Sequence, residues 1–263
     1  MIEIPFDPIM LKMGPVLLSW HGFFTLVGVV AGVALSAQLA RVSGINPDYV
    51  YNTAIWGVLA AIIGARFIHV IDHLDVYASD PLKIFAIYQG GIAIWGAVLG
   101  GFVGGVIYTK IVKYPTWRLA DIAAPGLILG MAIGRIGDII NGEHCALVSQ
   151  APWAFVYTHI DSPAVFCHMS SPSLPMHPAV VYEMFWDLLI LGGLLLLRGK
   201  IAPAGMSFVS LLGFYAIGRF FISFLRDDRI WFLGLQESQV ICILVLVVTV
   251  PLLAYKGEFR RSS

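Results

Sequence analysis

The chain has 263 residues, of which 59% are hydrophobic and only 12% are charged. A typical soluble domain carries about 25% charged residues, so this composition excludes a single water-soluble domain and predicts a polytopic membrane protein. The formal net charge is zero, which argues against a nucleic-acid partner.

Apolar segments in chain order predict an all-α fold with about seven transmembrane helices, forming a single integral membrane domain over residues 1–263. The segments cover roughly residues 16–39, 50–70, 87–112, 122–135, 179–197, 205–225 and 240–254. The second and fourth are interrupted or short by the criterion of ~20 apolar residues, and the fourth has polar neighbours that can extend it. The N-terminus has no basic region followed by a short apolar segment and a cleavage site, so we expect no removable signal peptide.

The positive charges predict the orientation. Nine of the 16 Lys and Arg residues follow the odd-numbered spans, four lie on the opposite side, and three lie in spans or at their ends. Because cytoplasmic loops carry the excess of positive charge, the N-terminus is expected outside and the C-terminus in the cytoplasm. The nine are Arg41, Lys110, Lys113, Arg118, Arg198, Lys200, Lys256, Arg260 and Arg261, and the four are Lys12, Lys83, Arg226 and Arg229.

The longest loop, residues 138–177, is then outside and contains no Lys or Arg. We expect an ordered cap, because Trp153, Phe155, Tyr157 and Phe166 offer apolar surface to bury. The loop also contains Cys145 and Cys167, for which we expect a disulfide bridge in an oxidising compartment, with two free thiols as the alternative. Cys242, in the seventh span, is expected to be reduced.

Glycines recur at four-residue spacing in three spans, a pattern that lets helix backbones approach closely in lipid. A groove for a lipid chain is the alternative interpretation. The glycines are Gly28 and Gly32, then Gly96, Gly100 and Gly104, then Gly126, Gly130 and Gly134.

Ionisable side chains within spans cost free energy in a bilayer and therefore need a reason. An arginine paired with an acid could merely hold helices together. A cluster of arginines at headgroup depth instead suggests a phospholipid headgroup, because guanidinium matches phosphate through two parallel hydrogen bonds. The residues concerned are His21, Arg66, Arg135, Glu183, Asp187 and Arg219.

The stretch GRIGDIINGEHC, residues 134–145, places five polar or charged side chains directly after an apolar run. We expect a helix end that opens into a loop, with Gly134, Gly137 and Gly142 permitting turns. Arg135 and Asp138 are three residues apart and would share a helix face. Polar backbone at membrane depth requires cover by protein or access to water, so this stretch predicts the wall of a polar cavity.

That stretch resembles the signature of the prolipoprotein diacylglyceryl transferase family, Gly-Arg-x-Gly-Asn-Phe-x-Asn-x-Glu. Further segments resemble the family in the same order and extend the resemblance over nearly the whole chain. They are FDPIMLKMGPVLLSWHG, GARFIHV, YQGGIAIWGAVLGG, APWAFVY, HPAVVYE and GRFFISFLRDD.

The resemblance implies seven spans in a bacterial plasma membrane and a transferase that modifies lipoproteins. Its expected partners are phosphatidylglycerol in the membrane and the signal peptides of preprolipoproteins. Diacylglycerol would pass from phosphatidylglycerol to the thiol of the lipobox cysteine, forming a thioether and releasing glycerol phosphate. No cofactor and no metal is expected.

The resemblance also implies site residues. Arg135 matches the signature arginine that binds the phosphatidylglycerol headgroup and is expected to be catalytic as well, and Arg219 matches an arginine needed for activity. Arg66, Asn141, Gly142 and Glu143 match further substrate-binding positions. The chain departs from the family at four positions, where Trp95 replaces a histidine often proposed as the base, His21 a tyrosine, Asp138 an asparagine and Ser223 a glutamate.

With the family histidine missing, His21 and His144 are the candidate bases, and we expect His21 to act with Arg135 and Arg219. An interfacial hydrogen bond is the alternative for His21, and loop packing is the alternative for His144. The other histidines are scattered without tight ligand spacing, so we expect no metal site; they are His69, His73, His159, His168 and His177. A non-catalytic relative that binds anionic phospholipid or lipoprotein precursors is the alternative function, and a solute channel is a third.

Overall fold

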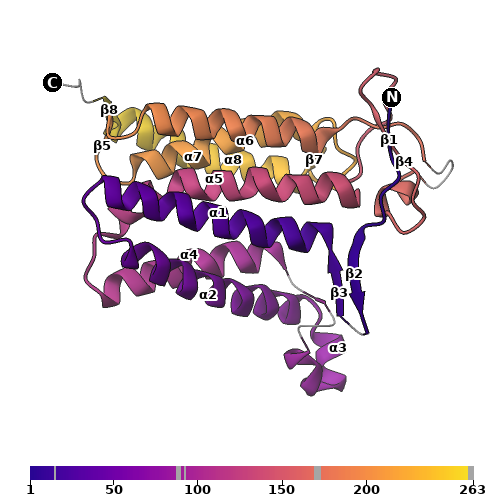
Figure 1. The fold of residues 1–263 in the computed structure, drawn as a ribbon, viewed down its shortest axis with the longest axis horizontal. Helices are drawn as coiled ribbons and strands as arrows, with labels where there is room; N and C mark the ends of the chain where they lie inside the picture. The colour runs from indigo at the N-terminus through magenta and orange to yellow at the C-terminus, as the bar shows by residue number, and fades with distance from the viewer. Residues whose placement is uncertain (15, 87–89, 92, 169–172, 260–263) are drawn as a thin grey trace. The chain divides into compact units, whose positions relative to one another are not determined.

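The computed structural model describes residues 1–14, 16–86, 90–91, 93–168 and 173–259. Among these residues, seven helices are long and apolar enough to cross a membrane, which confirms the predicted polytopic membrane protein (Figure 1). They are α1 (Trp20–Val42), α2 (Asp48–Asp72), α4 (Ile94–Ile111), α5 (Thr116–Asn141), α6 (Ala179–Leu196), α7 (Met206–Ser223) and α8 (Glu237–Lys256).

The first three spans differ from their predicted bounds. Residues 16–19 form a strand instead of the start of α1, and α2 runs without interruption for 25 residues. Helix α4 begins at Ile94, seven residues after the predicted start; residues 87–89 and 92 of that prediction lie outside the described residues.

The predicted fourth span, 122–135, is too short. Helix α5 has 26 residues, includes Pro125, and continues through Asp138 to Asn141. Gly134 and Gly137 are therefore helical, and only Gly142 adopts a positive φ, +68°. The helix end predicted within residues 134–145 lies at Asn141, and the turns expected at Gly134 and Gly137 do not form, because the polar side chains of this stretch find partners while the backbone keeps its helical hydrogen bonds. The long loop predicted for residues 138–177 accordingly starts at Gly142, not at Asp138.

The chain forms two compact units, one of Met1–Ser36 with Ala120–Ser263 and one of Ala37–Leu119. The single domain expected over residues 1–263 stays a prediction. In the second unit, α2 packs against α4, and a Cβ added at Gly96 or Gly100 would collide with the backbone of α2. A short helix α3 (Leu74–Ser79) and a 3₁₀ helix η1 (Pro81–Phe85) follow α2.

In the first unit, α1 and α5 approach closely through glycines. A Cβ at Gly28 would lie 2.5 Å from the carbonyl oxygen of Gly130, and one at Gly32 would collide with that of Gly126. The glycine spacing thus permits tight helix packing, as predicted, except at Gly134, where a Cβ would have no described atom within 4 Å.

Helix α7 packs on both α6 and α8 (Figure 1). Its N-terminus is held by Asp121 of α5, whose carboxylate accepts hydrogen bonds from the backbone N–H groups of Gly205 at 2.6 Å and Phe208 at 3.0 Å. A carboxylate at this position satisfies donors that the first turn of a helix leaves free and complements the helix dipole.

Short strand pairs, which the all-α prediction did not include, connect the helices. β1 (Ile2–Ile4) pairs in parallel with β4 (Phe155–Tyr157), and β2 (Ile9–Met13) pairs with β3 (Val16–Ser19). Two further antiparallel pairs are β5 (Ile201–Ala202) with β8 (Glu258–Phe259) and β6 (Ile230–Phe232) with β7 (Leu235–Gln236). Strands of two to five residues are too short for an alternating pattern to stand out in a mainly apolar sequence.

The β1–β4 pair attaches the N-terminal arm to the long loop between α5 and α6, where the Met1 ammonium also donates to the carbonyl of Pro152 at 2.6 Å (Figure 1). The loop is ordered around a small apolar core that includes Tyr157, with Phe155 packed against it. Trp153 and Phe166 are more than half exposed, so only two of the four predicted aromatic side chains contribute to this core.

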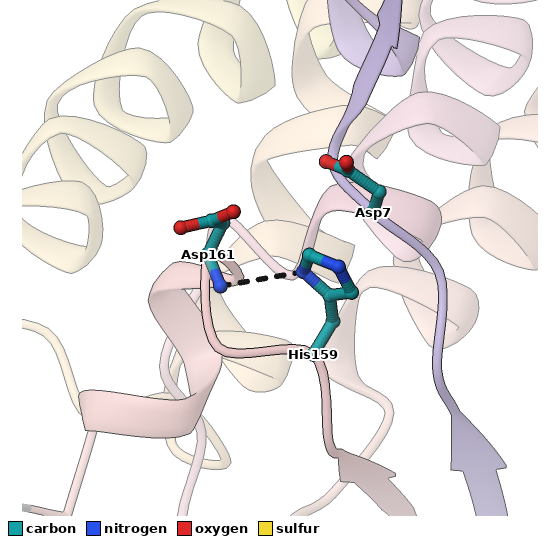
Figure 2. A group of neighbouring side chains, drawn as sticks. All are labelled: Asp7, His159 and Asp161. Atoms are coloured by element: carbon teal, nitrogen blue, oxygen red, sulfur yellow. Dashed lines mark hydrogen bonds between the residues drawn. The ribbon is translucent and has the colours of Figure 1, made fainter.

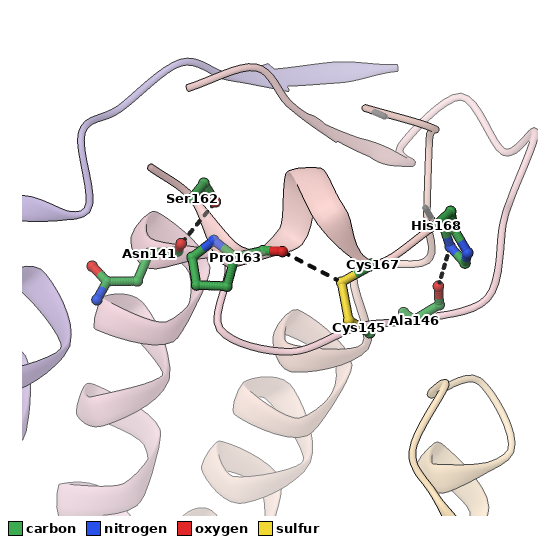
Figure 3. The surroundings of a disulfide bond; sticks show 7 residues. All are labelled: Asn141, Cys145, Ala146, Ser162, Pro163, Cys167 and His168. Carbon is green, nitrogen blue, oxygen red and sulfur yellow. Dashed lines mark hydrogen bonds between the residues drawn. A yellow bond between two sulfur atoms is a disulfide. The ribbon is translucent and has the colours of Figure 1, made fainter. Parts of the chain in front are cut away.

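Cys145 and Cys167 form a disulfide, with their Cα atoms 5.4 Å apart, and Cys242 is free and buried. The bridge joins the segment after α5 to the end of a 3₁₀ helix, η3 (Pro163–Phe166) (Figure 3). His168, next to Cys167, contacts the carbonyl of Ala146 at 3.1 Å, so both sides of the bridge are also linked by a hydrogen bond.

Candidate active site

A buried carboxylate on α6 joins two arginines from α5 and α7. Glu183 is completely buried, and its two oxygens accept hydrogen bonds from Arg135 Nη2 at 2.6 Å and Arg219 Nη1 at 2.8 Å. The Tyr215 hydroxyl donates to the same carboxylate at 2.9 Å. Asp187, the other acid predicted as a partner, is buried, and neither of its oxygens has a hydrogen-bond partner within the described residues.

A third arginine, which the sequence analysis had placed only in a loop, belongs to the same cluster. Arg226 is 4% exposed; its Nη1 lies 3.9 Å from Glu183 Oε2, and its Nε donates to Asp228 at 2.8 Å. Asp228 is also 3.7 Å from Arg219 Nη2. The signal for Arg226 was its place as the ninth residue of the segment GRFFISFLRDD, directly before two acids.

Asp138 connects this arginine cluster to a histidine on another helix. One of its oxygens accepts from Arg135 Nη1 at 2.9 Å, and the other is 2.5 Å from Nδ1 of His21 at the start of α1. His144 Nε2 lies 3.7 Å from the oxygen that binds Arg135, and Glu143 Oε2 lies 3.5 Å from His21 Nδ1. The structure thus brings His21 together with the polar stretch of α5.

The end of α5 presents two further predicted residues to this group. Asn141 Nδ2 donates to Glu143 Oε1 at 2.8 Å, so the two side chains are positioned by each other. The carbonyl of Asn141 accepts from Ser162 Oγ at 2.8 Å, which fixes the helix end to the disulfide-bridged loop (Figure 3).

Gly142 allows the chain to leave α5 in contact with the loop. Its φ of +68° lies in the left-handed region, and a Cβ there would come within 2.8 Å of the Tyr157 ring. Tyr157 donates to the carbonyl of Ile139 at 2.8 Å, while burial and the charge of Asp138 raise the pKa of the Tyr157 hydroxyl well above its usual range. Any residue other than glycine would strain this turn and push the loop away from α5.

Arg66 lies in the second unit, where its guanidinium donates hydrogen bonds to backbone carbonyl groups. It is 6% exposed and stands 5.1 Å from the centre of the Tyr77 ring. The donors of Arg66 thereby fix the segment after α3, and the predicted contact of Arg66 with a substrate stays a prediction. The carbonyls belong to Lys83, Ile84, Gly90 and Gly91.

Ser223 and Trp95, two of the four departures from the family pattern, differ in their burial and contacts. Ser223 is completely buried, donates to the carbonyl of Arg219 at 2.7 Å, and shares a hydrogen bond with Ser238 of α8 at 3.0 Å. It therefore supports the α7 backbone at Arg219. Trp95 lies in the first turn of α4, in the second unit, and is 41% exposed.

His159, one of the histidines whose sequence spacing does not suggest a metal site, lies near two carboxylates in the structure. Asp7, His159 and Asp161 place one possible ligand atom each within 4.8 Å of the others (Figure 2). The backbone N–H of Asp161 also donates to His159 Nδ1 at 3.3 Å. Asp7 and Asp161 are exposed, and exposed side chains of this kind commonly gather without an ion, so the expected absence of a metal stays a prediction.

Comparison with known proteins agrees with the resemblance. The sequence profile of prolipoprotein diacylglyceryl transferase matches residues 8–255. A phosphatidylglycerol–prolipoprotein diacylglyceryl transferase of Oceanobacillus iheyensis is 35% identical over 257 residues, covering 97% of this chain and 89% of the relative. Relatives of the same name from Trichormus variabilis (35% identical, 97% and 91% covered) and Listeria welshimeri (31% identical, 96% and 90% covered) are similar over the same extent. The chain therefore belongs to the prolipoprotein diacylglyceryl transferase family.

Proposed function

We propose that this protein transfers diacylglycerol from phosphatidylglycerol to the thiol of the lipobox cysteine of a preprolipoprotein. The thiolate sulfur attacks the glycerol carbon that carries the phosphate, a C–S bond forms, and the C–O bond breaks with its electron pair on the departing glycerol phosphate. The observation that carries the proposal is the buried cluster of Arg135, Arg219 and Arg226 around Glu183, with the pair His21–Asp138 beside it.

The reaction places new negative charge on the leaving phosphate, and preorganised donors lower its barrier most when they are aimed at that charge. Each guanidinium has five N–H donors, and Glu183 engages only part of them. The side chains of Arg135 and Arg219 are each 16% exposed, whereas that of Arg226 is 3% exposed. Arg135 and Arg219 are therefore the two arginines proposed to touch the phosphate, and Arg226 balances Glu183 and Asp228 behind them.

The remaining proposed roles follow from position and chemistry. Asn141 and Glu143, with the turn at Gly142, bind the hydroxyl-rich end of the headgroup, and Arg66 has a proposed role in substrate binding because it matches an arginine of the family's second span. A free thiol has a pKa of about 8.5, so a base is needed near neutral pH, and His21 has the suitable chemistry. The proposed reaction uses no cofactor and no metal.

The proposed location is the bacterial plasma membrane, with the N-terminus outside and the C-terminus in the cytoplasm. The excess of Lys and Arg after the odd-numbered spans supports this orientation. The loop with the Cys145–Cys167 disulfide would then face the oxidising side, where such a bond persists.

The test is transfer by the purified protein in detergent, given phosphatidylglycerol and a peptide that carries a lipobox cysteine. The expected product is a peptide heavier by one diacylglyceryl group, together with free glycerol phosphate. Arg135→Ala and Arg219→Ala should abolish transfer while the protein still inserts, and Arg229→Ala, at an exposed arginine outside the cluster, should not.

The same experiment distinguishes the transferase from the alternative function, a relative that binds phospholipid without catalysis. Binding of phosphatidylglycerol without any modified peptide would reject the transferase and identify a non-catalytic phospholipid-binding relative. Near-normal turnover in Arg135→Ala would leave Arg135 only the structural role that its ion pairs with Asp138 and Glu183 already describe.

A further inference from the structure

Two of the four departures from the family pattern meet in this structure. His21 stands where many members have tyrosine and Asp138 where the signature has asparagine, and the two side chains, 117 positions apart, form a hydrogen bond. We propose that Asp138 is a positioning residue that holds the His21 imidazole as the proton acceptor for the substrate thiol. This inference rests on the proposed transferase function.

The geometry of the pair determines which nitrogen can react. Nδ1 of His21 lies 2.5 Å from Asp138 Oδ1, so Nδ1 carries the ring proton and donates it in a hydrogen bond to the carboxylate. A carboxylate at one ring nitrogen fixes the tautomer and the orientation of the ring, which leaves Nε2 with a free electron pair. The Asp138 side chain is 5% exposed and that of His21 is 43% exposed, so the imidazole extends from a buried anchor to an accessible position.

The backbone keeps the two residues in register. A Cβ at Gly137 would lie 2.6 Å from the Cα of His21 and 2.8 Å from the carbonyl oxygen of Trp20, so only glycine lets the start of α1 reach this turn of α5. Asp138 is also fixed from the other side by Arg135, three residues earlier on the same helix. The carboxylate therefore has little freedom to turn away from His21.

The charges around the imidazole suit a proton acceptor. When the thiol proton moves to Nε2, its electron pair stays on sulfur, and the Nδ1 side of the imidazolium that forms lies 2.5 Å from the Asp138 carboxylate and 3.5 Å from that of Glu143. Arg135, on the far side of Asp138, holds that carboxylate and is itself proposed to bind the phosphate. The proton can then pass to the departing glycerol phosphate or to water, which returns His21 to its starting state.

The alternative is that the pair only connects α1 to α5 while the thiol loses its proton to solvent. A double-mutant cycle separates the two. His21→Phe is expected to lower kcat about 100-fold or more, the lower end of what a general base contributes. Asp138→Asn is expected to lower kcat about 10–100-fold, the usual cost of losing an orienting partner, with an unchanged KM for phosphatidylglycerol.

The double variant is the critical measurement. Because Asp138 acts through His21, His21→Phe with Asp138→Asn should be no slower than His21→Phe alone. Multiplicative losses would overturn the positioning role, and so would a loss in His144→Phe as large as that in His21→Phe. Should Asp138→Asn not fold, Asp138→Glu keeps the charge beside Arg135 while changing its reach to His21, and full activity in that variant would also overturn the proposal.

A readout independent of turnover distinguishes this proposal from the proposed function. In protein with ¹⁵N-labelled histidine, His21 should give the signal of an imidazole protonated at Nδ1 and strongly hydrogen-bonded, and Asp138→Asn should remove it. Absence of that signal in the active wild-type protein would reject the pairing alone. A wild-type protein that shows the signal but transfers nothing would reject the function, and with it the catalytic role of the pair.

Discussion

Replacing Glu183 with glutamine tests whether this carboxylate is the electrostatic centre of the first unit. The change keeps the size and one acceptor oxygen but removes the charge between Arg135, Arg219 and Arg226. Removing one partner of a buried ion pair typically costs about 3–5 kcal/mol, because the remaining charge stays buried and uncompensated. With Glu183 completely buried, we expect Glu183→Gln to lose stability in that range.

The measurement is equilibrium unfolding of the purified protein in mixed micelles with increasing SDS. Glu3→Gln is the matched control, since Glu3 is exposed and accepts the hydroxyl of Thr158 at 3.1 Å, and its effect should stay within about 0.5 kcal/mol. The double variant Glu183→Gln with Arg219→Gln removes one charge of each sign, so it should recover part of the loss, with a coupling energy of about 0.5–3 kcal/mol.

A loss below about 1 kcal/mol in Glu183→Gln, comparable to an exposed pair, would refute the reasoning. The arginine charges would then be balanced by solvent instead of by Glu183. Purely additive effects in the double variant would lead to the same conclusion.

The other predictions concern the loop. Thiol labelling of the denatured, unreduced protein should modify Cys242 alone, whereas three labelled cysteines would contradict the Cys145–Cys167 bridge. Gly142→Ala should lower the thermal unfolding temperature and the transfer rate together, because its φ is positive and Tyr157 fills the space; an unaltered melting curve would contradict this. The pKa of the Tyr157 hydroxyl is raised in the folded state. Above about pH 10, the ordinary tyrosine value, unfolding therefore releases the proton of this hydroxyl, and the free energy of unfolding falls as the pH rises further. Compared at each pH, Tyr157→Phe should lack this contribution, and identical alkaline slopes for the two proteins would count against it.

The sequence alone determined the class of the protein and the residues that needed partners. Apolar runs long enough to span a bilayer are a local property, so all seven spans were predicted, although their ends moved by several residues. The distribution of Lys and Arg between the two sides of the membrane is also read from the sequence alone, so it predicts the orientation. The stretch of residues 134–145 identified Arg135, Asn141 and Glu143, because polar side chains next to an apolar run are informative without any coordinates.

Only the tertiary structure decided which of these residues meet. Glu183 and Asp187 are one turn apart on α6 and equal candidates in the sequence, yet Glu183 alone receives the hydrogen bonds of Arg135 and Arg219. The His21–Asp138 pair depends on a contact between α1 and α5 that Gly137 permits. Helix rotation and tilt are set by packing against neighbouring helices, and hydropathy does not encode them, which is why the partners of buried charges had to come from the fold.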